Sequence, residues 1–201
     1  MKALVIVSHP SPKSFNHALA EAVCETWASL GCDIAFHDLY REQFQPLLTA
    51  DEARGAEPVD PLVQEHIGQL RESDLLGVVH PNCWGSPPAM MKGWIDRVFA
   101  PEAAYTFAKG DDQGDEPIGL LMTRAALVLN TGNTVLEREH DHFGDPLDRI
   151  WRRCILDFCG VQEVSRALFG VVATSTPEQR AAWLHQAKTM AGETHRLAAR
   201  P

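Results

Sequence analysis

The chain has 201 residues, and its 27 acidic side chains outnumber its 18 basic ones, which gives a formal net charge of −9 at pH 7. This length is typical of one domain with a sizeable core, so we expect a single domain over residues 1–201. The acidic balance argues against nucleic acid or an anionic membrane as a partner, because both need a basic face. No apolar run approaches the roughly 18 residues of a membrane span, so we expect no membrane insertion.

The five cysteines are odd in number and form no Cys-x-x-Cys pair. Free thiols in that pattern are typical of a reducing compartment. The apolar stretch at the N-terminus is too short for the core of a signal peptide. We therefore expect a cytoplasmic protein.

The first half of the chain alternates between strand and helix patterns. Residues 3–8 are a short apolar run typical of a buried parallel strand, and the apolar spacing over 14–30 predicts a helix that ends at Gly31. A second strand is predicted over 32–39. The segment 40–61 is a long, charged connection with three prolines, and a loop of that length is usually functional or mobile.

The second half continues the same alternation. It predicts helices over 61–72, 88–99, 146–158 and 177–197 and strands over 75–81, 125–130 and 164–172. Strands that alternate with helices form parallel sheets with crossover connections. We therefore predict an α/β fold of the flavodoxin-like, doubly wound type, with five parallel strands in the order 2-1-3-4-5 and helices on both faces.

Three predicted loops follow the carboxyl ends of the first, third and fourth strands. In this topology these ends meet at the switch point, where ligands bind. The first loop offers Ser14 and the free N–H groups of a helix start, which suit a phosphate. The second loop is stiffened by prolines and carries Trp84, and the third turns at Gly132, where backbone N–H groups can approach a ligand. Together these features describe a site for a ligand of the size of flavin mononucleotide.

Longer motifs add a family resemblance that covers nearly the whole chain. They are His9…Ser14-Phe15-Asn16, Pro81-x-x-Trp84…Pro88-Ala89-x-x-Lys92-Gly93-Trp94-Ile95-Asp96-Arg97-Val98-Phe99, Ala104-Tyr105-Thr106-Phe107 and Phe158-Cys159-Gly160. In these motifs the chain resembles the flavodoxin-like NAD(P)H:quinone reductases. That group is similar to DT-diaphorase and to the flavoprotein subunits that regulate potassium efflux systems.

The resemblance implies a set of cofactor-binding residues. The phosphate loop would be His9, Ser14, Phe15 and Asn16; the stretch along the flavin ring Pro81, Asn82, Cys83, Trp84 and Gly85; and the loop at its pyrimidine side Asn130, Thr131, Gly132 and Asn133. It also implies a homodimer in which Tyr105 and Phe107 reach over the flavin of the opposite subunit. There the pair would bind substrate, and Tyr105 is a catalytic candidate.

The resemblance further implies an enzyme that moves a hydride from NADH or NADPH, through FAD or FMN, to a small quinone-like acceptor. The segment after Gly132 lacks the Tyr…His spacing of the mammalian-like members, so the proton donor does not carry over. His140 and His142 are our candidates, because imidazole titrates near neutrality. The same two histidines lie near carboxylates and could share a metal, but no third ligand stands at a recognisable spacing, so we predict no metal site.

Two other functions stay open at this point. One is a flavodoxin-type electron carrier, although the first loop lacks the hydroxyl- and glycine-rich phosphate motif of that group. The other is a regulatory flavoprotein subunit of an ion-efflux system. The sequence leaves the choice between FMN and FAD, the choice between NADH and NADPH, and the physiological acceptor open.

Overall fold

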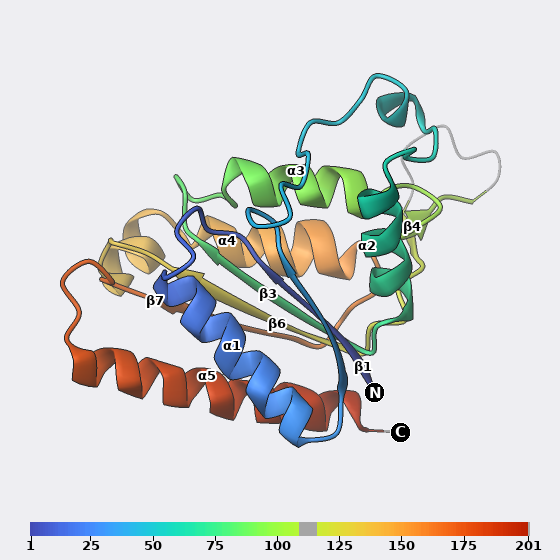
Figure 1. Cartoon of the computed structure of the whole chain (residues 1–201). Helices are drawn as coiled ribbons and strands as arrows, with labels where there is room; N and C mark the ends of the chain where they lie inside the picture. The colour runs from blue at the N-terminus through green and yellow to red at the C-terminus, as the bar shows by residue number, and fades with distance from the viewer. Residues whose placement is uncertain (109–115, 201) are drawn as a thin grey trace.

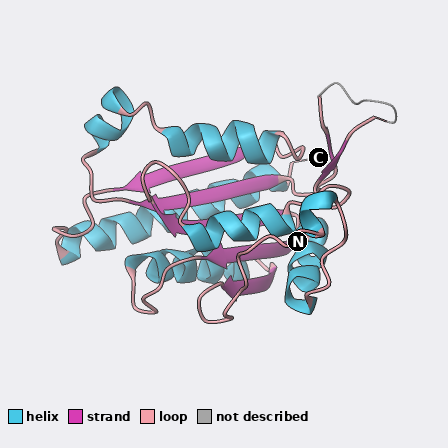
Figure 2. Ribbon diagram, turned by 90° about the horizontal axis from the view of Figure 1, so that it is seen from above, coloured by secondary structure: helices cyan, strands magenta, loops and turns pink. Residues whose placement is uncertain are grey.

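A five-stranded parallel sheet in the order β2-β1-β3-β6-β7 forms the centre of the computed structural model, which describes residues 1–108 and 116–200 (Figure 1). The strands are β1 (Lys2–Val7), β2 (Asp33–Asp38), β3 (Leu75–Pro81), β6 (Ala125–Thr131) and β7 (Val164–Phe169). They run side by side through the middle of the molecule (Figure 2). The predicted order 2-1-3-4-5 is confirmed, because β6 and β7 are the fourth and fifth strands of this sheet.

Helices cover both faces of the sheet, as the sequence predicts. The helices α1 (Phe15–Ser29) and α5 (Pro177–Ala198) lie on one face, and α2 (Pro61–Glu72), α3 (Ala89–Val98) and α4 (Pro146–Arg149) on the other (Figure 1). Successive strand residues point to opposite faces. In β1, Val5 and Val7 therefore pack toward α1 and α5, whereas Leu4 and Ile6 pack toward α2 and α3.

The helices begin at residues that the sequence marks as caps. Ser14 has extended backbone and its side chain accepts from His17 N, so α1 begins at the next residue. Thr176 forms a capping box with Gln179 at the start of α5, where Pro177 is the first helical residue. These contacts satisfy backbone N–H groups that a helix start leaves without intrahelical partners.

Three details differ from the predicted elements. The last strand ends at Phe169 rather than at residue 172, because Val172 N donates to Gly132 O and the chain turns toward that loop. The predicted helix 146–158 is α4 followed by a wider, π-helical segment η3 (Ile150–Asp157). An antiparallel pair, β4 (Tyr105–Thr106) with β5 (Ile118–Gly119), was not predicted.

The long connection 40–61 is held against α3. It contains a short 3₁₀ turn, η1 (Glu52–Arg54). The buried Arg97 of α3 donates to Glu52 Oε1 at 2.6 Å and to Gln45 O at 2.7 Å. Gly93, one turn earlier, allows the backbone of Pro46 to lie directly on the helix. Gly93 and Arg97 of the motif over residues 92–97 therefore hold this connection on α3.

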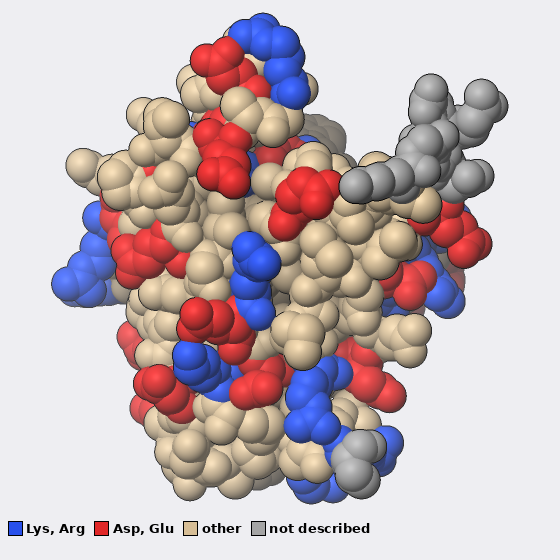
Figure 3. All heavy atoms as spheres, turned by 90° about the vertical axis from the view of Figure 1, so that its right-hand side faces the viewer, with Lys and Arg blue, Asp and Glu red and all other residues tan. Residues whose placement is uncertain are grey.

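The molecular surface agrees with an acidic chain of mixed charge. On the face that includes β4, acidic and basic side chains are interspersed and gather into no large basic area (Figure 3). Within residues 1–108 and 116–200, no helix combines the length and the apolar character needed to cross a membrane.

Candidate functional site

The three predicted loops meet at the carboxyl edge of the sheet. Asn16, at the start of α1, donates to Thr131 Oγ1 at the end of β6, with 3.0 Å between the two atoms. Asn82 N, just after β3, donates to Thr131 O at 2.7 Å, and Gly132 N donates to Phe169 O at 2.9 Å. Thr131 is therefore the point that joins the loops after β1, β3 and β6.

The first loop has the donors that a phosphate needs. Its backbone folds on His9, whose Nδ1 accepts from Ser11 N at 3.0 Å. Ser14 caps α1, so the following N–H groups of the first turn have no intrahelical acceptor and carry the positive end of the helix dipole. At the base of the loop, Ser8 Oγ is buried and has no hydrogen-bond partner among the described residues.

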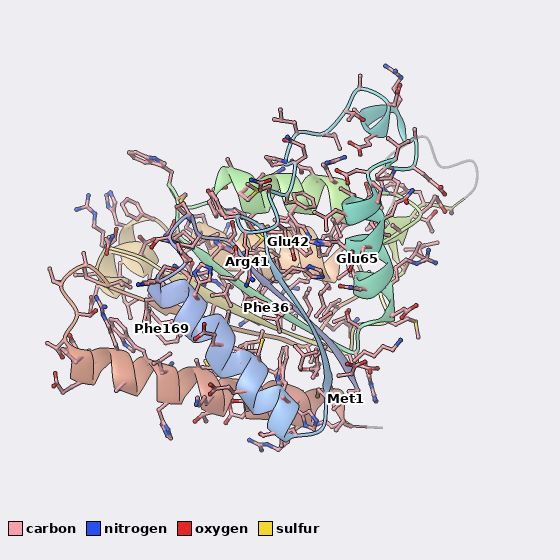
Figure 4. All side chains as sticks on the ribbon, viewed as in Figure 1. Met1, Phe36, Arg41, Glu42, Glu65 and Phe169 are labelled. Carbon is pink, nitrogen blue, oxygen red and sulfur yellow. The ribbon has the colours of Figure 1, made fainter. Side chains whose placement is uncertain are left out.

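Phe15 belongs to this loop through its backbone only. Its ring packs against Phe169, with 6.5 Å between ring centroids, and against Trp183 of α5 at 5.8 Å. Figure 4 labels Phe169 beside the start of α1. The side chain thus stabilises the join between α1, β7 and α5, and its N–H group remains at the helix start.

The second loop is a tight hairpin with Trp84 at its tip. Cys83 and Ser86 exchange two backbone hydrogen bonds of 3.0 and 3.1 Å, and Trp84 and Gly85 have φ angles of 58° and 74°. Two consecutive positive φ angles indicate a type I′ turn, a conformation that costs a residue with a Cβ about 1–2 kcal/mol. The Trp84 side chain is fully exposed, which excludes a core role. An exposed indole on a turn with a strained backbone, at the junction of three loops, favours contact with a ligand.

The rest of the hairpin is well fixed. Gly85 N donates to Asn82 Oδ1 at 2.8 Å, and a Cβ on Gly85 would lie 2.6 Å from Pro146 Cγ. Burial raises the pKa of the Cys83 thiol, so this thiol stays protonated and unreactive near neutral pH.

Asn130 lies inside the protein rather than in the loop. The even-numbered residues of β6 face α3 and η3, so the Asn130 side chain points there, where Arg166 Nε donates to its Oδ1 at 2.8 Å. Its amide nitrogen lies 3.1 Å from Nε2 of His80, which also accepts from Trp151 Nε1 at 2.9 Å. Burial lowers the pKa of His80 to about 4, so the ring is neutral at pH 7. This network of Arg166, Asn130, His80 and Trp151 fixes the strand ends under the site.

The third loop is held by the chain that follows β7. Asn133 Oδ1 accepts from Ala173 N at 2.9 Å, and Val172 N donates to Gly132 O at 3.0 Å. Gly132 has an ordinary negative φ, and a Cβ there would make only van der Waals contacts. Gly132 N already donates to Phe169 O. The backbone N–H groups left for a ligand are therefore those of Asn133 and Thr134.

The two candidate histidines lie on a helical turn, η2 (Arg138–His142), and not on an extended loop. His140 is exposed, with Nδ1 3.7 Å from Asp145 Oδ2, and His142 packs its ring against Phe143. The buried residue of this turn is Glu139, whose Oε2 accepts from Asn82 Nδ2 at 3.2 Å. Glu139 therefore ties the turn to the Trp84 hairpin, a connection that the sequence analysis missed.

Tyr105 and Phe107 lie at the amino-terminal end of the sheet's strands, the end opposite to these loops. Their rings form a cluster with Phe158, with centroid distances of 4.8 and 6.3 Å to that residue. The cluster stands at the amino ends of β6 and β7, because Leu121 N donates to Cys159 O just before both strands begin. Burial raises the pKa of Tyr105, so its hydroxyl stays protonated and can donate.

A hollow of about 790 Å³ opens beside this cluster. Its lining includes Leu48, Arg97, Tyr105, Cys154 and Phe158. The fastened connection 40–61 therefore forms one wall of a large depression next to the predicted aromatic pair.

A second polar cluster joins the end of β2 to α2. His37 Nδ1 lies 2.7 Å from Glu42 Oε1, and its Nε2 lies 2.5 Å from Gln69 Oε1 (Glu42 is labelled in Figure 4). His66 Nε2 faces Glu42 Oε2 at 3.4 Å, while its Nδ1 accepts from Trp94 Nε1 at 2.9 Å. His37, Glu42 and His66 are metal-ligand types within 4.8 Å of one another. However, a neutral ring that accepts at Nδ1 carries its proton at Nε2. The two histidine rings also lie close together, tilted by 42° with 3.8 Å between their centroids. That arrangement fits an ion pair better than a metal site.

We expect the His37–Glu42 pair to stabilise the fold most between about pH 4.5 and about pH 6.5. Burial lowers the pKa of His37, but the bonds to Glu42 and Gln69 outweigh it and raise the pKa above 6.5. Burial likewise raises the pKa of Glu42, and the bonds to His37 and His66 outweigh it and lower the value to about 2. The histidine contribution is thus lost as the pH rises through its raised pKa, and the glutamate contribution as the pH falls toward 2.

The measurement is the free energy of urea unfolding of the wild type and of His37→Gln as a function of pH. The difference should be largest inside the stated window and shrink on both sides. His185→Gln, at an exposed position of α5, is the control and should give a difference near zero throughout. A His37→Gln difference independent of pH would contradict the assignment.

Comparison with known proteins gives one consistent family. The model of a family described as having a flavodoxin-like fold matches residues 1–192. The chain is 30% identical over 217 aligned positions to ribosyldihydronicotinamide dehydrogenase [quinone] of Mus musculus, covering 94% of this chain and 91% of that one. An NAD(P)H:quinone oxidoreductase from Methanothermobacter marburgensis has the same fold, with a TM-score of 0.79, 24% identity and 95% of both chains covered. An FMN-dependent NADH-azoreductase from Bacillus anthracis, solved with FMN, has a TM-score of 0.72 at 18% identity, with 98% of this chain and all of that chain covered.

Proposed function

Because this chain belongs to the flavodoxin-like fold family, we propose that it is a flavin-dependent NAD(P)H oxidoreductase. Its reaction moves a hydride from NADH or NADPH, by way of bound FMN or FAD, to a quinone or a similar electron-poor acceptor. The name of the Mus musculus relative, together with the near-complete overlap of the two chains, supports this class of reaction.

The observation that carries the proposal is the junction of three loops at Thr131. It brings a phosphate-type helix start, an exposed indole and a backbone turn to one edge of the sheet. The residues present fit a flavin, because a flavin combines a phosphate with a flat ring that has a polar edge. Ser14 and the first N–H groups of α1 would hold the phosphate, and the Trp84 hairpin would lie along the ring.

When bound, the flavin supplies the hydride chemistry; the protein supplies orientation and electrostatics. The N–H groups of Asn133 and Thr134 would donate to the pyrimidine edge, where negative charge grows during reduction. The acceptor also needs a proton. His140, His142 and the protonated hydroxyl of Tyr105 are the candidate donors.

We further propose a homodimer, since one chain cannot bring its own aromatic pair to its own loops. Tyr105 and Phe107 stand at the amino edge of the sheet, and the Trp84 hairpin stands at the carboxyl edge. A two-fold related copy can place one edge over the other and complete two identical sites. Light scattering of the purified protein tests this, and a monomer at micromolar concentration would remove Tyr105 from the site.

A cytoplasmic location is part of the same proposal. All five cysteines are free thiols, and burial raises the pKa of Cys159 to about 12 and that of Cys24 to about 11. Unpaired thiols of this kind are typical of a reducing compartment.

The decisive experiment is the visible spectrum of the protein reconstituted with FMN or FAD, before and after anaerobic NADH or NADPH. Flavin bands that bleach with a nicotinamide and return with a quinone would support the proposal and identify cofactor and donor. A bound flavin that neither nicotinamide reduces would favour a carrier or a regulatory subunit instead.

We expect Trp84→Ala to weaken flavin binding about tenfold while leaving the fold intact. The indole is exposed, so its removal costs no core packing and relieves no buried contact. Fluorescence titration with FMN measures the affinity, and urea unfolding checks the fold. Met122→Ala, which also removes an exposed apolar side chain but lies before β6, is the control. Unchanged affinity in folded Trp84→Ala would exclude the indole from the cofactor site.

A further inference from the structure

Three hydrogen-bonded side chains lead inward from the phosphate loop. Ser14 Oγ lies 2.7 Å from His17 Nδ1, and His17 Nε2 lies 3.0 Å from Asp38 Oδ2. Asp38 Oδ1 accepts from the backbone N–H groups of Tyr40 at 3.1 Å and Arg41 at 3.2 Å, just after β2 (Arg41 is labelled in Figure 4). The His17 and Asp38 side chains are 10% and 9% exposed, whereas Ser14 is half-buried. A buried carboxylate is thus connected to the open end of the loop.

The Asp38 contact fixes one proton of the His17 ring. A carboxylate can only accept, so His17 Nε2 carries a hydrogen and donates it to Asp38. The state of Nδ1 is then the only variable. In the neutral ring Nδ1 accepts from the Ser14 hydroxyl, and in the imidazolium Nδ1–H donates to Ser14 Oγ.

The protonation state of His17 Nδ1 determines whether Ser14 Oγ offers a hydrogen or a lone pair to a ligand. A hydroxyl has one hydrogen and two lone pairs, and one lone pair already accepts from His17 N at 3.3 Å. With a neutral ring the hydrogen is taken by Nδ1, so a lone pair faces the loop and opposes an anion. With an imidazolium both lone pairs are taken, so the hydrogen is free to donate to a phosphate oxygen.

We propose that His17 and Asp38 are positioning residues that couple the binding of a phosphate dianion to the uptake of one proton. The inference rests on the proposed flavin function. The proton comes from solvent and goes to His17 Nδ1, and the Ser14 O–H turns from the ring to the phosphate. No covalent bond forms or breaks. The consequence is a preference for phosphorylated over unphosphorylated flavin that weakens as the pH rises.

The charged surroundings agree with this direction. Asp38 and His9 are ionisable side chains that face the His17 ring from other elements. Asp38, at the end of β2, places a carboxylate oxygen 3.0 Å from His17 Nε2. His9, in the loop after β1, stands edge-on with 6.4 Å between ring centroids and would oppose a second charge only if protonated itself. A phosphate dianion bound next to Ser14 would place a second negative group near the His17 ring, in addition to Asp38.

The first test uses the wild-type protein with FMN and with riboflavin, which lacks the phosphate. Calorimetric titration in two buffers of different ionisation enthalpy counts the protons taken up, from about pH 7 to about pH 9. The FMN phosphate is already a dianion there, because its second pKa is about 6. We expect uptake to approach one proton per FMN and to stay near zero for riboflavin. Where uptake is one, the FMN-to-riboflavin affinity ratio should fall about tenfold per pH unit.

The second test uses His17→Gln, whose amide cannot be protonated, and His185→Gln as a control on an exposed surface. In His17→Gln the affinity ratio should become independent of pH, while His185→Gln should behave like the wild type. Equal proton uptake with FMN and riboflavin, or an unchanged slope in His17→Gln, would overturn the coupling and leave the flavin function standing. Failure of FMN and riboflavin to bind the wild type while FAD binds would overturn the coupling alone, and failure of all three flavins would overturn the coupling and the proposed function together.

Discussion

Replacing Arg166 by methionine should lower the free energy of unfolding by roughly 3–5 kcal/mol, the cost of removing one partner from a buried ion pair. The Arg166 side chain is 4% exposed, and its Nη1 donates to Asp145 Oδ2 at 2.7 Å. Its Nε donates to Asn130 Oδ1 at 2.8 Å. Methionine fills a similar volume but leaves the Asp145 carboxylate and the Asn130 amide without their donor. Urea unfolding at pH 7 measures the loss.

Arg153→Met is the matched control for that change. Arg153 is 78% exposed, and its pair with Asp157 at 3.5 Å spans one helical turn, so we expect a change within about 0.5 kcal/mol. Arg166→Lys keeps the charge but cannot reach both partners, and it should fall between the two. Equal stabilities of Arg166→Met and Arg153→Met would mean that the buried pair contributes nothing to the fold.

Replacing Gly93 by alanine should destabilise the protein by about 3 kcal/mol, although alanine is the better helix former. A Cβ on Gly93 would overlap the carbonyl oxygen and Cα of Pro46, which are backbone atoms that cannot rotate away. Moving them shifts the adjacent Gln45 carbonyl, which accepts from Arg97 at 2.7 Å. The strain and the loss of that hydrogen bond act together.

Gly68→Ala provides a control of opposite sign. Gly68 is also a helical glycine, in α2, but a Cβ there would meet no atom within 4 Å. Its replacement should stabilise the protein by about 1 kcal/mol through helix propensity alone. Thermal or urea unfolding of the two variants should therefore shift in opposite directions. A stabilising Gly93→Ala would show that the connection 40–61 is not packed on α3 in solution.

The fold was predictable because its signals are local. The buried strands β1, β3 and β6 are continuous apolar runs, and the rule of right-handed crossovers orders them once the helices are recognised. The cap at Ser14 and the exposed position of Trp84 also follow from short motifs. The strands of the β4–β5 pair are two residues each, too short for any period to show. The π-helical η3 has the apolar spacing of an ordinary helix, so its wider turn leaves no mark in the pattern.

Of the candidate site, the sequence predicted mainly the loops whose backbone groups face the carboxyl ends of the strands. The predicted strand ends at Asn130, and the resemblance counts this residue with the cofactor loop. However, β6 continues through Thr131, and the alternation of a strand turns Asn130 inward and Thr131 toward α1. His80 and Arg166 read as isolated polar residues in apolar strands, and their common partner lies 50 and 36 residues away, respectively. The His17–Asp38 contact is equally hidden, because it joins a helix to the end of a different strand. Contacts between residues that lie this far apart in the sequence are made by the fold and leave no local sequence pattern.

The separation of the Trp84 hairpin from the Tyr105 cluster makes the protein open to complementation. If two subunits complete each site, a chain with Trp84→Ala still carries an intact aromatic cluster, and a chain with Tyr105→Ala still carries an intact hairpin. In a mixed dimer both lesions fall in one site, and the other site is whole. Random pairing of equal amounts of two impaired variants should therefore restore roughly a quarter of the sites. Two damaged copies of the gene in one cell would then make some working enzyme, which neither copy makes alone.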